Sequence, residues 1–187
     1  MSSALKYLDQ GASISGCGRF RYRLWREWGR NFGEGSGTLA FAGLNPSSAD
    51  ADEDDPTVRK LVGFARRLGC MRLEVVNAFA RIATHPGNLL TLDPFEDPGQ
   101  VFGPGERNET TIGVVVDNNP RYLVLGWGVH PLVPRMLNAD EHLLWHLFEA
   151  GSADAFRLNF NGSPAHPLYL SYDLVPRSIE GLRKELP

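Results

Sequence analysis

The sequence predicts an α/β domain in which helices cover both faces of a mostly parallel sheet. The composition, 42% hydrophobic and 22% charged over 187 residues, is ordinary for a globular protein. Within it, short apolar segments alternate along the chain with segments of helical periodicity. Strand–helix–strand alternation is typical of parallel sheets with crossover helices. We therefore expect a three-layer α/β/α arrangement with a central four-stranded sheet and an N-terminal edge strand.

Local patterns place the individual elements. Residues 19–28 alternate arginine with apolar side chains, as in a half-buried edge strand. The remaining predicted strands, which are largely apolar, are residues 38–44, 73–77, 122–126, 156–160 and 168–170. The predicted helices are residues 55–69, 106–117 and 140–150. We expect residues 1–17 to be irregular and residues 84–104 to form a surface loop.

Length and composition favour one cytoplasmic domain over residues 1–187, with its core at about residues 19–171. No apolar run approaches the roughly 20 residues that a membrane span needs, and the first residues lack the cationic and apolar segments of a secretion signal. Cys17 and Cys70 match no metal-ligand spacing, and two cysteines make no disulfide framework. These features leave the oligomeric state open.

Charge is unevenly distributed in this acidic chain. The net charge of −3 argues against nucleic-acid binding by bulk electrostatics. Arginines nevertheless cluster near the N-terminus, and acidic residues cluster within residues 50–55. Period-2 alternation puts Arg19, Arg21 and Arg23 on one face, and we expect this face to contact phosphates. In the alternative interpretation, both clusters are solvated faces that compensate each other.

Polar or glycine-rich segments follow several predicted strands at the points where they end. Asn45 lies in the turn Gly43-Leu44-Asn45-Pro46-Ser47, Asn77 and Trp127 end or follow the next two strands, and His166 lies between two prolines. Ligands of open parallel sheets bind beyond the carboxyl ends of the strands. We therefore expect Asn45, Asn77, Trp127 and His166 to surround one pocket. The alternative for each asparagine is a turn in which its side chain bonds local backbone.

These motifs resemble those of a known enzyme superfamily. The segments Ala42–Ser47, Asp55–Lys60, Val75–Ala78 and His166-Pro167 are similar to motifs of the uracil-DNA glycosylase superfamily, especially its mismatch-specific branch. The chain departs from that branch at Ser47, where glycine is usual, and at Leu168, where serine is usual. Over about residues 19–171 the sequence also resembles a bacterial and phage family of unknown function.

The glycosylase resemblance implies a uracil-DNA-glycosylase-like fold and hydrolysis of an N-glycosidic bond in DNA or a nucleotide, without metal or cofactor. A base taken out of the stack would enter the pocket. It implies that Asn45 and His166 are catalytic. The implied substrate-binding residues are Gly43, Pro46, Ser47, Asn77, Trp127, Arg59 and Lys60, and the implied DNA-backbone contacts are Arg19, Arg21 and Arg23.

Two other functions fit the sequence. The first is a non-catalytic module that binds nucleotides or nucleic acid in the same pocket. The second is a metal-dependent phosphodiesterase or nuclease, in which the carboxylates of the Asp50–Asp55 segment would hold Mg²⁺. No phosphate-binding loop or dinucleotide fingerprint follows a predicted strand, which argues against nucleotide binding by those two motifs.

Overall fold

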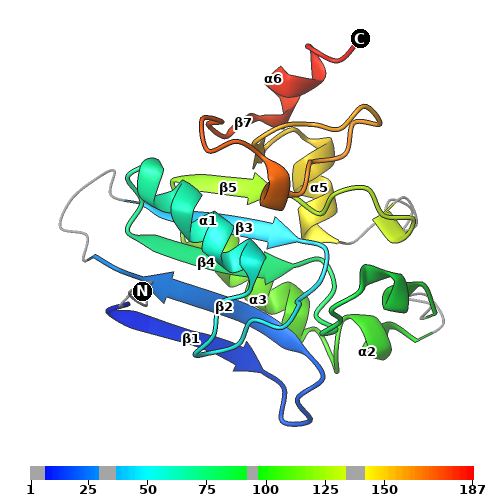
Figure 1. Ribbon diagram of the computed structural model, residues 1–187. Coiled ribbons are helices and arrows are strands. Elements are labelled where there is room, and N and C mark those ends of the chain that lie inside the picture. Colours follow the sequence, from blue (N-terminus) through cyan, green and yellow to red (C-terminus); the bar gives the residue numbers. More distant parts are fainter. Residues whose placement is uncertain (1–6, 30–36, 92–96, 134–141) are drawn as a thin grey trace.

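A computed structural model describes residues 7–29, 37–91, 97–133 and 142–187. One sheet of seven strands runs through these residues in the order β1-β2-β4-β3-β5-β6-β7 (Figure 1). The strands are β1 (Asp9–Ile14), β2 (Arg21–Glu27), β3 (Thr38–Gly43), β4 (Arg72–Asn77), β5 (Tyr122–Leu125), β6 (Asp154–Ala155) and β7 (Arg177–Ser178).

The centre of the sheet is parallel and its margins are antiparallel. Strands β4, β3, β5 and β6 run parallel, whereas β1, β2 and β7 each run antiparallel to their neighbours. The expected parallel centre is therefore present. The expectation of a four-stranded sheet with one edge strand is wrong, because the antiparallel additions bring the sheet to seven strands.

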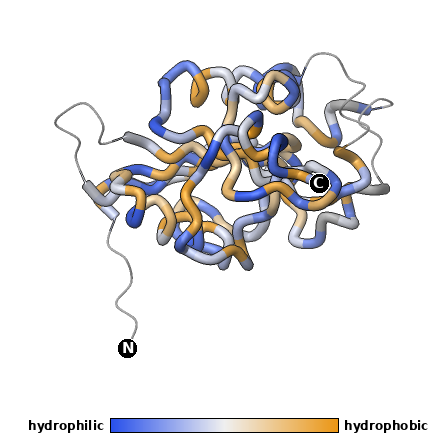
Figure 2. The backbone as a smooth tube through the Cα atoms, turned by 90° about the horizontal axis from the view of Figure 1, so that it is seen from above, coloured by the Kyte–Doolittle hydropathy of each residue, from blue (hydrophilic) through white to orange (hydrophobic). Residues whose placement is uncertain are grey.

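Helices pack on both faces of the sheet. Alternation along β3 directs Leu39 and Phe41 toward the layer of α1 (Pro56–Arg67), while Ala40 and Ala42 contact the layer of α3 (Arg107–Asp117). Helices α5 (Leu143–Glu149) and α6 (Ile179–Arg183) contribute to the α3-side core. Viewed from above, hydrophobic residues follow the strands between two layers of chain (Figure 2). None of the helices described is long and apolar enough to cross a membrane.

The N-terminal part of the sheet differs from the prediction. The edge strand is β1, which lies in the segment expected to be irregular, and β2 is an inner strand between β1 and β4. Ser13 pairs with Arg23 but Ile14 pairs with Arg21, so β2 carries one additional residue, Tyr22, at this point. Such a bulge interrupts the alternation of side chains along the strand.

The C-terminal strands were also predicted wrongly. In place of a strand at residues 156–160, β6 consists of two residues, and residues 168–170 belong to a 3-10 turn, η2 (Pro167–Tyr169), and its cap. Part of the predicted 84–104 loop is η1 (Pro86–Thr91) and α2 (Pro98–Val101). The predicted helix 140–150 is α5 with its cap at His142, and residues 140 and 141 lie outside the described residues.

Candidate functional site

A cavity of about 400 Å³ lies beyond the carboxyl ends of β3, β4 and β5. Its size falls within the usual range of small-molecule sites. Six of the residues predicted to be catalytic or to bind substrate line it, namely Gly43, Asn45, Ser47, Asn77, Trp127 and His166. The structure therefore brings together the four residues that were expected to surround one pocket.

Asn45 is held by the backbone in a fixed orientation. Its Nδ2 donates to the carbonyl oxygens of Pro46 and Ala83, each at 2.8 Å. Because a carbonyl only accepts hydrogen bonds, the side-chain atom that makes these two contacts must be the amide nitrogen. The other polar atom of the side chain, Oδ1, is left for a ligand or water. The rigid turn after β3 thus presents an acceptor at the cavity.

Asn77 ends β4 and is buried, with 4% of its surface exposed. Its Nδ2 has no hydrogen-bond partner within the parts of the chain that the structure describes. An unpaired buried amide nitrogen is costly and is expected to find a partner in a ligand or water. Gly43 lets this side chain approach closely, since a Cβ atom at Gly43 would lie 2.9 Å from Asn77 Oδ1.

Trp127 follows β5 and forms a wall shared by two cavities. It lines the central cavity and a neighbouring one of about 610 Å³, and its ring packs edge-on against Phe148 at a centroid distance of 5.4 Å. Its buried Nε1 has no hydrogen-bond acceptor among the residues described. The indole therefore offers a further donor in the cavity wall.

His166 lies at the exposed mouth of the cavity and caps η2. Its Nδ1 accepts a hydrogen bond from the backbone N–H of Leu168 at 3.4 Å. Partial loss of hydration lowers the pKa of the ring, and the carboxylate of Asp55 acts in the opposite direction. The neutral ring therefore prevails at pH 7, and the accepting role of Nδ1 places its proton on Nε2.

Arg21 and Asp55 are cavity residues whose position the sequence did not reveal. Arg21 is 3% exposed, and its guanidinium donates to the Ala49 carbonyl. Desolvation lowers the pKa of Arg21 to about 10, opposed by Asp55 and Asp50, so the group stays charged at neutral pH. Asp55 was expected as a helix cap and, in one alternative, as part of an acidic metal-binding segment; it caps α1, where its Oδ1 accepts from the Val58 N–H at 2.8 Å.

Phe41 supplies an aromatic wall that sequence analysis also missed. It lies within an apolar strand, where nothing distinguishes it from a core residue. Two glycines pack against the Phe41 ring and could have marked it. A Cβ atom at Gly126 would lie 2.5 Å from the ring, and a Cβ atom at Gly43 would lie 3.2 Å from it. Together with Leu61 and Val75, Phe41 gives the cavity an apolar side.

Comparison with known proteins places the chain in a family. The family described as "Protein of unknown function (DUF1643)" matches residues 21–168. The chain belongs to this family. Neither a curated protein nor a solved structure matches the sequence. The match is consistent with the expected family of unknown function, whereas nothing in it links DUF1643 to the uracil-DNA glycosylase superfamily, and that likeness stays a prediction.

Three residues predicted to bind substrate in this DUF1643 domain lie behind or beside the cavity. Pro46 is buried behind the turn and accepts from the Ala83 N–H. Arg59 donates to the Asp54 carbonyl, and Lys60 lies 3.6 Å from the centroid of the Tyr172 ring. None of the three lines the cavity.

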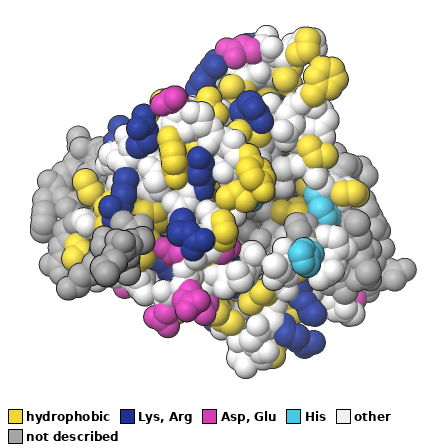
Figure 3. All heavy atoms as spheres, in the orientation of Figure 1, with side chains coloured by type: hydrophobic (Ala, Val, Ile, Leu, Met, Phe, Trp, Pro, Cys, Tyr) yellow, Lys and Arg dark blue, Asp and Glu magenta, His cyan; other side chains and the backbone are white. Residues whose placement is uncertain are grey.

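The three N-terminal arginines do not share one face. Arg21 points into the cavity, whereas Arg23 is paired with Glu74 at 2.7 Å and lines a separate hollow beside α3. Arg19 lies 5.9 Å from the Phe20 ring. The bulge at Tyr22 is the physical reason, since it breaks the alternation on which the prediction rested. The α1 face shows scattered Lys and Arg side chains rather than one basic patch (Figure 3).

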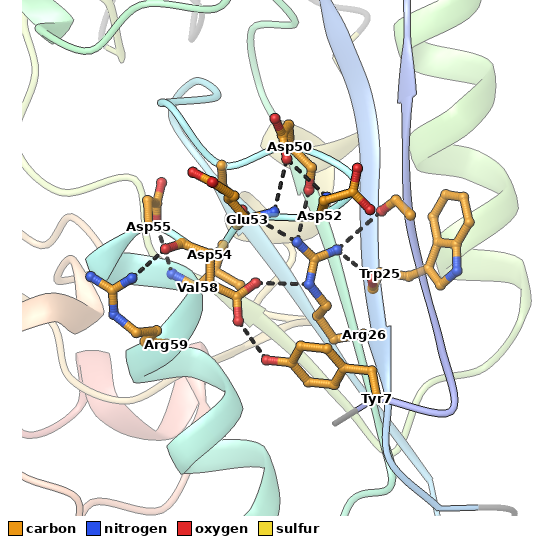
Figure 4. Close-up of polar contacts among 12 residues, drawn as sticks. Tyr7, Trp25, Arg26, Asp50, Asp52, Glu53, Asp54, Asp55, Val58 and Arg59 are labelled. Atoms are coloured by element: carbon orange, nitrogen blue, oxygen red, sulfur yellow. Dashed lines mark hydrogen bonds and ion pairs between the residues drawn. The ribbon is translucent and has the colours of Figure 1, made fainter. Parts of the chain in front are cut away.

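The acidic segment Asp50–Asp55 folds around Arg26 (Figure 4). Arg26 is fully buried; it contacts Asp54 Oδ1 at 2.7 Å and donates to the Asp50 carbonyl at 2.7 Å. Asp50 Oδ1 accepts from the backbone N–H groups of Asp52 and Glu53. These carboxylates therefore have structural partners, and over the described ranges no group of three His, Cys, Asp or Glu side chains is arranged to hold a metal.

Proposed function

We propose that this DUF1643 protein hydrolyses an N-glycosidic bond and releases a base from a nucleotide or from DNA. The observation that carries the proposal is that Asn45, Asn77 and His166 line the same cavity. Each offers a different group: an amide oxygen, an unpaired amide nitrogen and an imidazole N–H. A planar, mostly apolar ligand with polar edges fits such a lining.

In this proposal, Asn77 and Phe41 bind the base. The free Nδ2 of Asn77 donates to a carbonyl oxygen on the edge of the base, and its Oδ1 accepts from a ring N–H. Phe41 provides an aromatic surface for the ring. An amide that pairs with both a carbonyl and an N–H favours the imide edge of a uracil-type base, because a base without that pattern leaves a buried polar group unpaired.

In this proposal, Asn45 and His166 promote the hydrolysis. Asn45 Oδ1 holds a water toward the anomeric carbon, which forms a bond to the water oxygen as its bond to the base nitrogen breaks. The departing base takes the electron pair, and the Nε2–H of His166 and the Asn77 amide stabilise its charge. A proton from the water finally reaches the base, so the products are the free base and the sugar.

Base release from a defined panel tests this function. The substrates are uracil, thymine, cytosine and 5-substituted pyrimidines, each as nucleoside, 5′-monophosphate and single- and double-stranded oligonucleotide, with the free base quantified by chromatography. We expect release from at least one uracil-type substrate, unchanged by EDTA. Binding without release from any substrate would indicate a non-catalytic module, and activity abolished by EDTA would favour a metal-dependent phosphodiesterase.

A further inference from the structure

Arg21 differs from the other buried arginine of β2 in having no carboxylate partner. Arg26, also on β2, is paired with Asp54, and the less buried Arg23 and Arg72 are paired with Glu74 at 2.7 and 2.6 Å. No ion pair within 4.0 Å joins Arg21 to any carboxylate in the described segments, and its Nε has no hydrogen-bond partner there. A buried cation that is not directly paired with a carboxylate is unfavourable.

The surroundings of Arg21 in the cavity suit an anion. The first turn of α1 lines the same cavity through Pro56, Thr57 and Val58, and the N-terminus of a twelve-residue helix attracts negative charge. Thr57 and Ser47, which carry hydroxyl groups, line the same cavity. The carboxylate of Asp55 also lies there. It caps Val58 and favours the charged form of Arg21, but it leaves the Nε of Arg21 unsatisfied.

We propose that Arg21 and the first turn of α1 form an anion subsite that takes the terminal phosphate of a free nucleotide. This inference rests on the proposed function, because the base of that nucleotide would occupy the Asn77 side of the cavity. It narrows the substrate from a base in either DNA or a nucleotide to a nucleoside monophosphate.

The charges near the cavity favour a free nucleotide over DNA. The wall segment that includes Ser47 and Ser48 continues into the acidic residues 50–55, of which Asp52 and Glu53 are exposed. These carboxylates repel the many phosphates of a polynucleotide. Arg23, which would have to hold a DNA backbone, is already paired with Glu74. A single phosphate that reaches the buried Arg21 avoids both obstacles.

Titration with inorganic phosphate tests the subsite independently of catalysis. At constant ionic strength we expect phosphate to raise the Tm of the parent protein and of Arg23→Met, and to leave the Tm of Arg21→Met unchanged. Arg23→Met is the matched control, since it removes an arginine from the same strand outside the cavity. An equal response of Arg21→Met and the parent, or no response of the parent, would overturn the proposal.

A measurement on the unmodified sequence covers the case in which Arg21→Met fails to fold. Arginine side chains labelled with ¹⁵N give separate Nε–H signals, and through-bond correlation to the backbone assigns the signal of Arg21 in the parent protein. We expect phosphate to shift this signal while that of Arg26, which is bonded to Asp54, stays in place. An unmoved Arg21 signal at saturating phosphate would overturn the subsite.

Affinity for 2′-deoxyuridine and its 5′-monophosphate identifies the source of the phosphate. We expect the parent to bind the monophosphate about 10- to 100-fold more tightly, the usual value of a charge-assisted contact, and Arg21→Met to bind both equally. Tighter binding of an oligonucleotide than of the monophosphate would overturn the free-nucleotide assignment. Phosphate binding without base release would refute only the hydrolase, whereas equal release from nucleoside and monophosphate would refute only the subsite.

Discussion

A methyl group at Gly43 would lie 2.9 Å from the Oδ1 atom of Asn77, so the cavity depends on a residue without a side chain at the end of β3. Gly43→Ala is expected to displace the Asn77 amide and weaken base binding at least tenfold. Calorimetric titration with the substrate found in the panel measures this loss. Gly113→Ala is the control, because open space surrounds Gly113 in α3 and alanine there should stabilise the protein by about 0.5–1 kcal/mol. Unchanged binding by Gly43→Ala would mean that Asn77 does not contact the base.

Arg26 holds the acidic segment that leads into α1. Arg26→Met removes the charge bound to Asp54 and leaves the carbonyl oxygens of Asp50 and Trp25 without their donor. Breaking a buried pair in this way is expected to lower the free energy of unfolding by about 3–5 kcal/mol, measured by urea denaturation. The exposed pair Arg67–Asp173 is the control, and Arg67→Met should cost less than about 1 kcal/mol. Similar losses in both variants would refute the anchoring role of Arg26.

His166 links stability to pH. Its pKa is lowered in the folded state, so between that value and the unfolded value of about 6.5 the unfolded chain binds more protons. The contribution of His166 to the free energy of unfolding is therefore fully present above pH 6.5 and is lost as the pH falls through the pKa of the folded state. Protonation also ends the bond from the Leu168 N–H, because Nδ1 becomes a donor. As the pH is lowered from 7.5 to 5, the Tm of His166→Gln should fall less steeply than the Tm of the parent. Parallel curves would contradict the role of His166 in this pH dependence.

The two cysteines are expected to differ in reactivity. Hydrogen bonds from Ser15 and the Arg19 backbone lower the pKa of the exposed Cys17 to about 7, whereas burial raises the pKa of Cys70. Because the thiolate is the nucleophile, iodoacetamide at pH 7 should alkylate Cys17 first. Mass spectrometry of peptides over time measures both sites, with Cys17→Ser as the control. Faster labelling of Cys70 would show that the core around it opens.

The sequence predicted which residues line the cavity better than it predicted the margins of the sheet. Asn45 and Asn77 stand out because a polar residue directly follows an apolar strand, and this change of polarity is visible locally. The sequence does not show that β2 gains a residue at Tyr22, which sends Arg21 and Arg23 to opposite faces. Strand β1 was missed because its small and polar residues resemble a loop, although Gly11 lies against the Trp25 ring of β2. Strand β6, with two residues, is too short for a periodicity.

The role of Asn45 is the central claim, and single-turnover base release measures it most directly. Asn45 acts on the attacking water, so Asn45→Ala should slow base release by about 10²–10³ while substrate affinity changes little. Asn45→Ala also loses the two hydrogen bonds to backbone carbonyl oxygens, so the Tm of the variant is measured to show that it remains folded. A folded Asn45→Ala protein that releases the base at the parent rate would contradict the proposed mechanism.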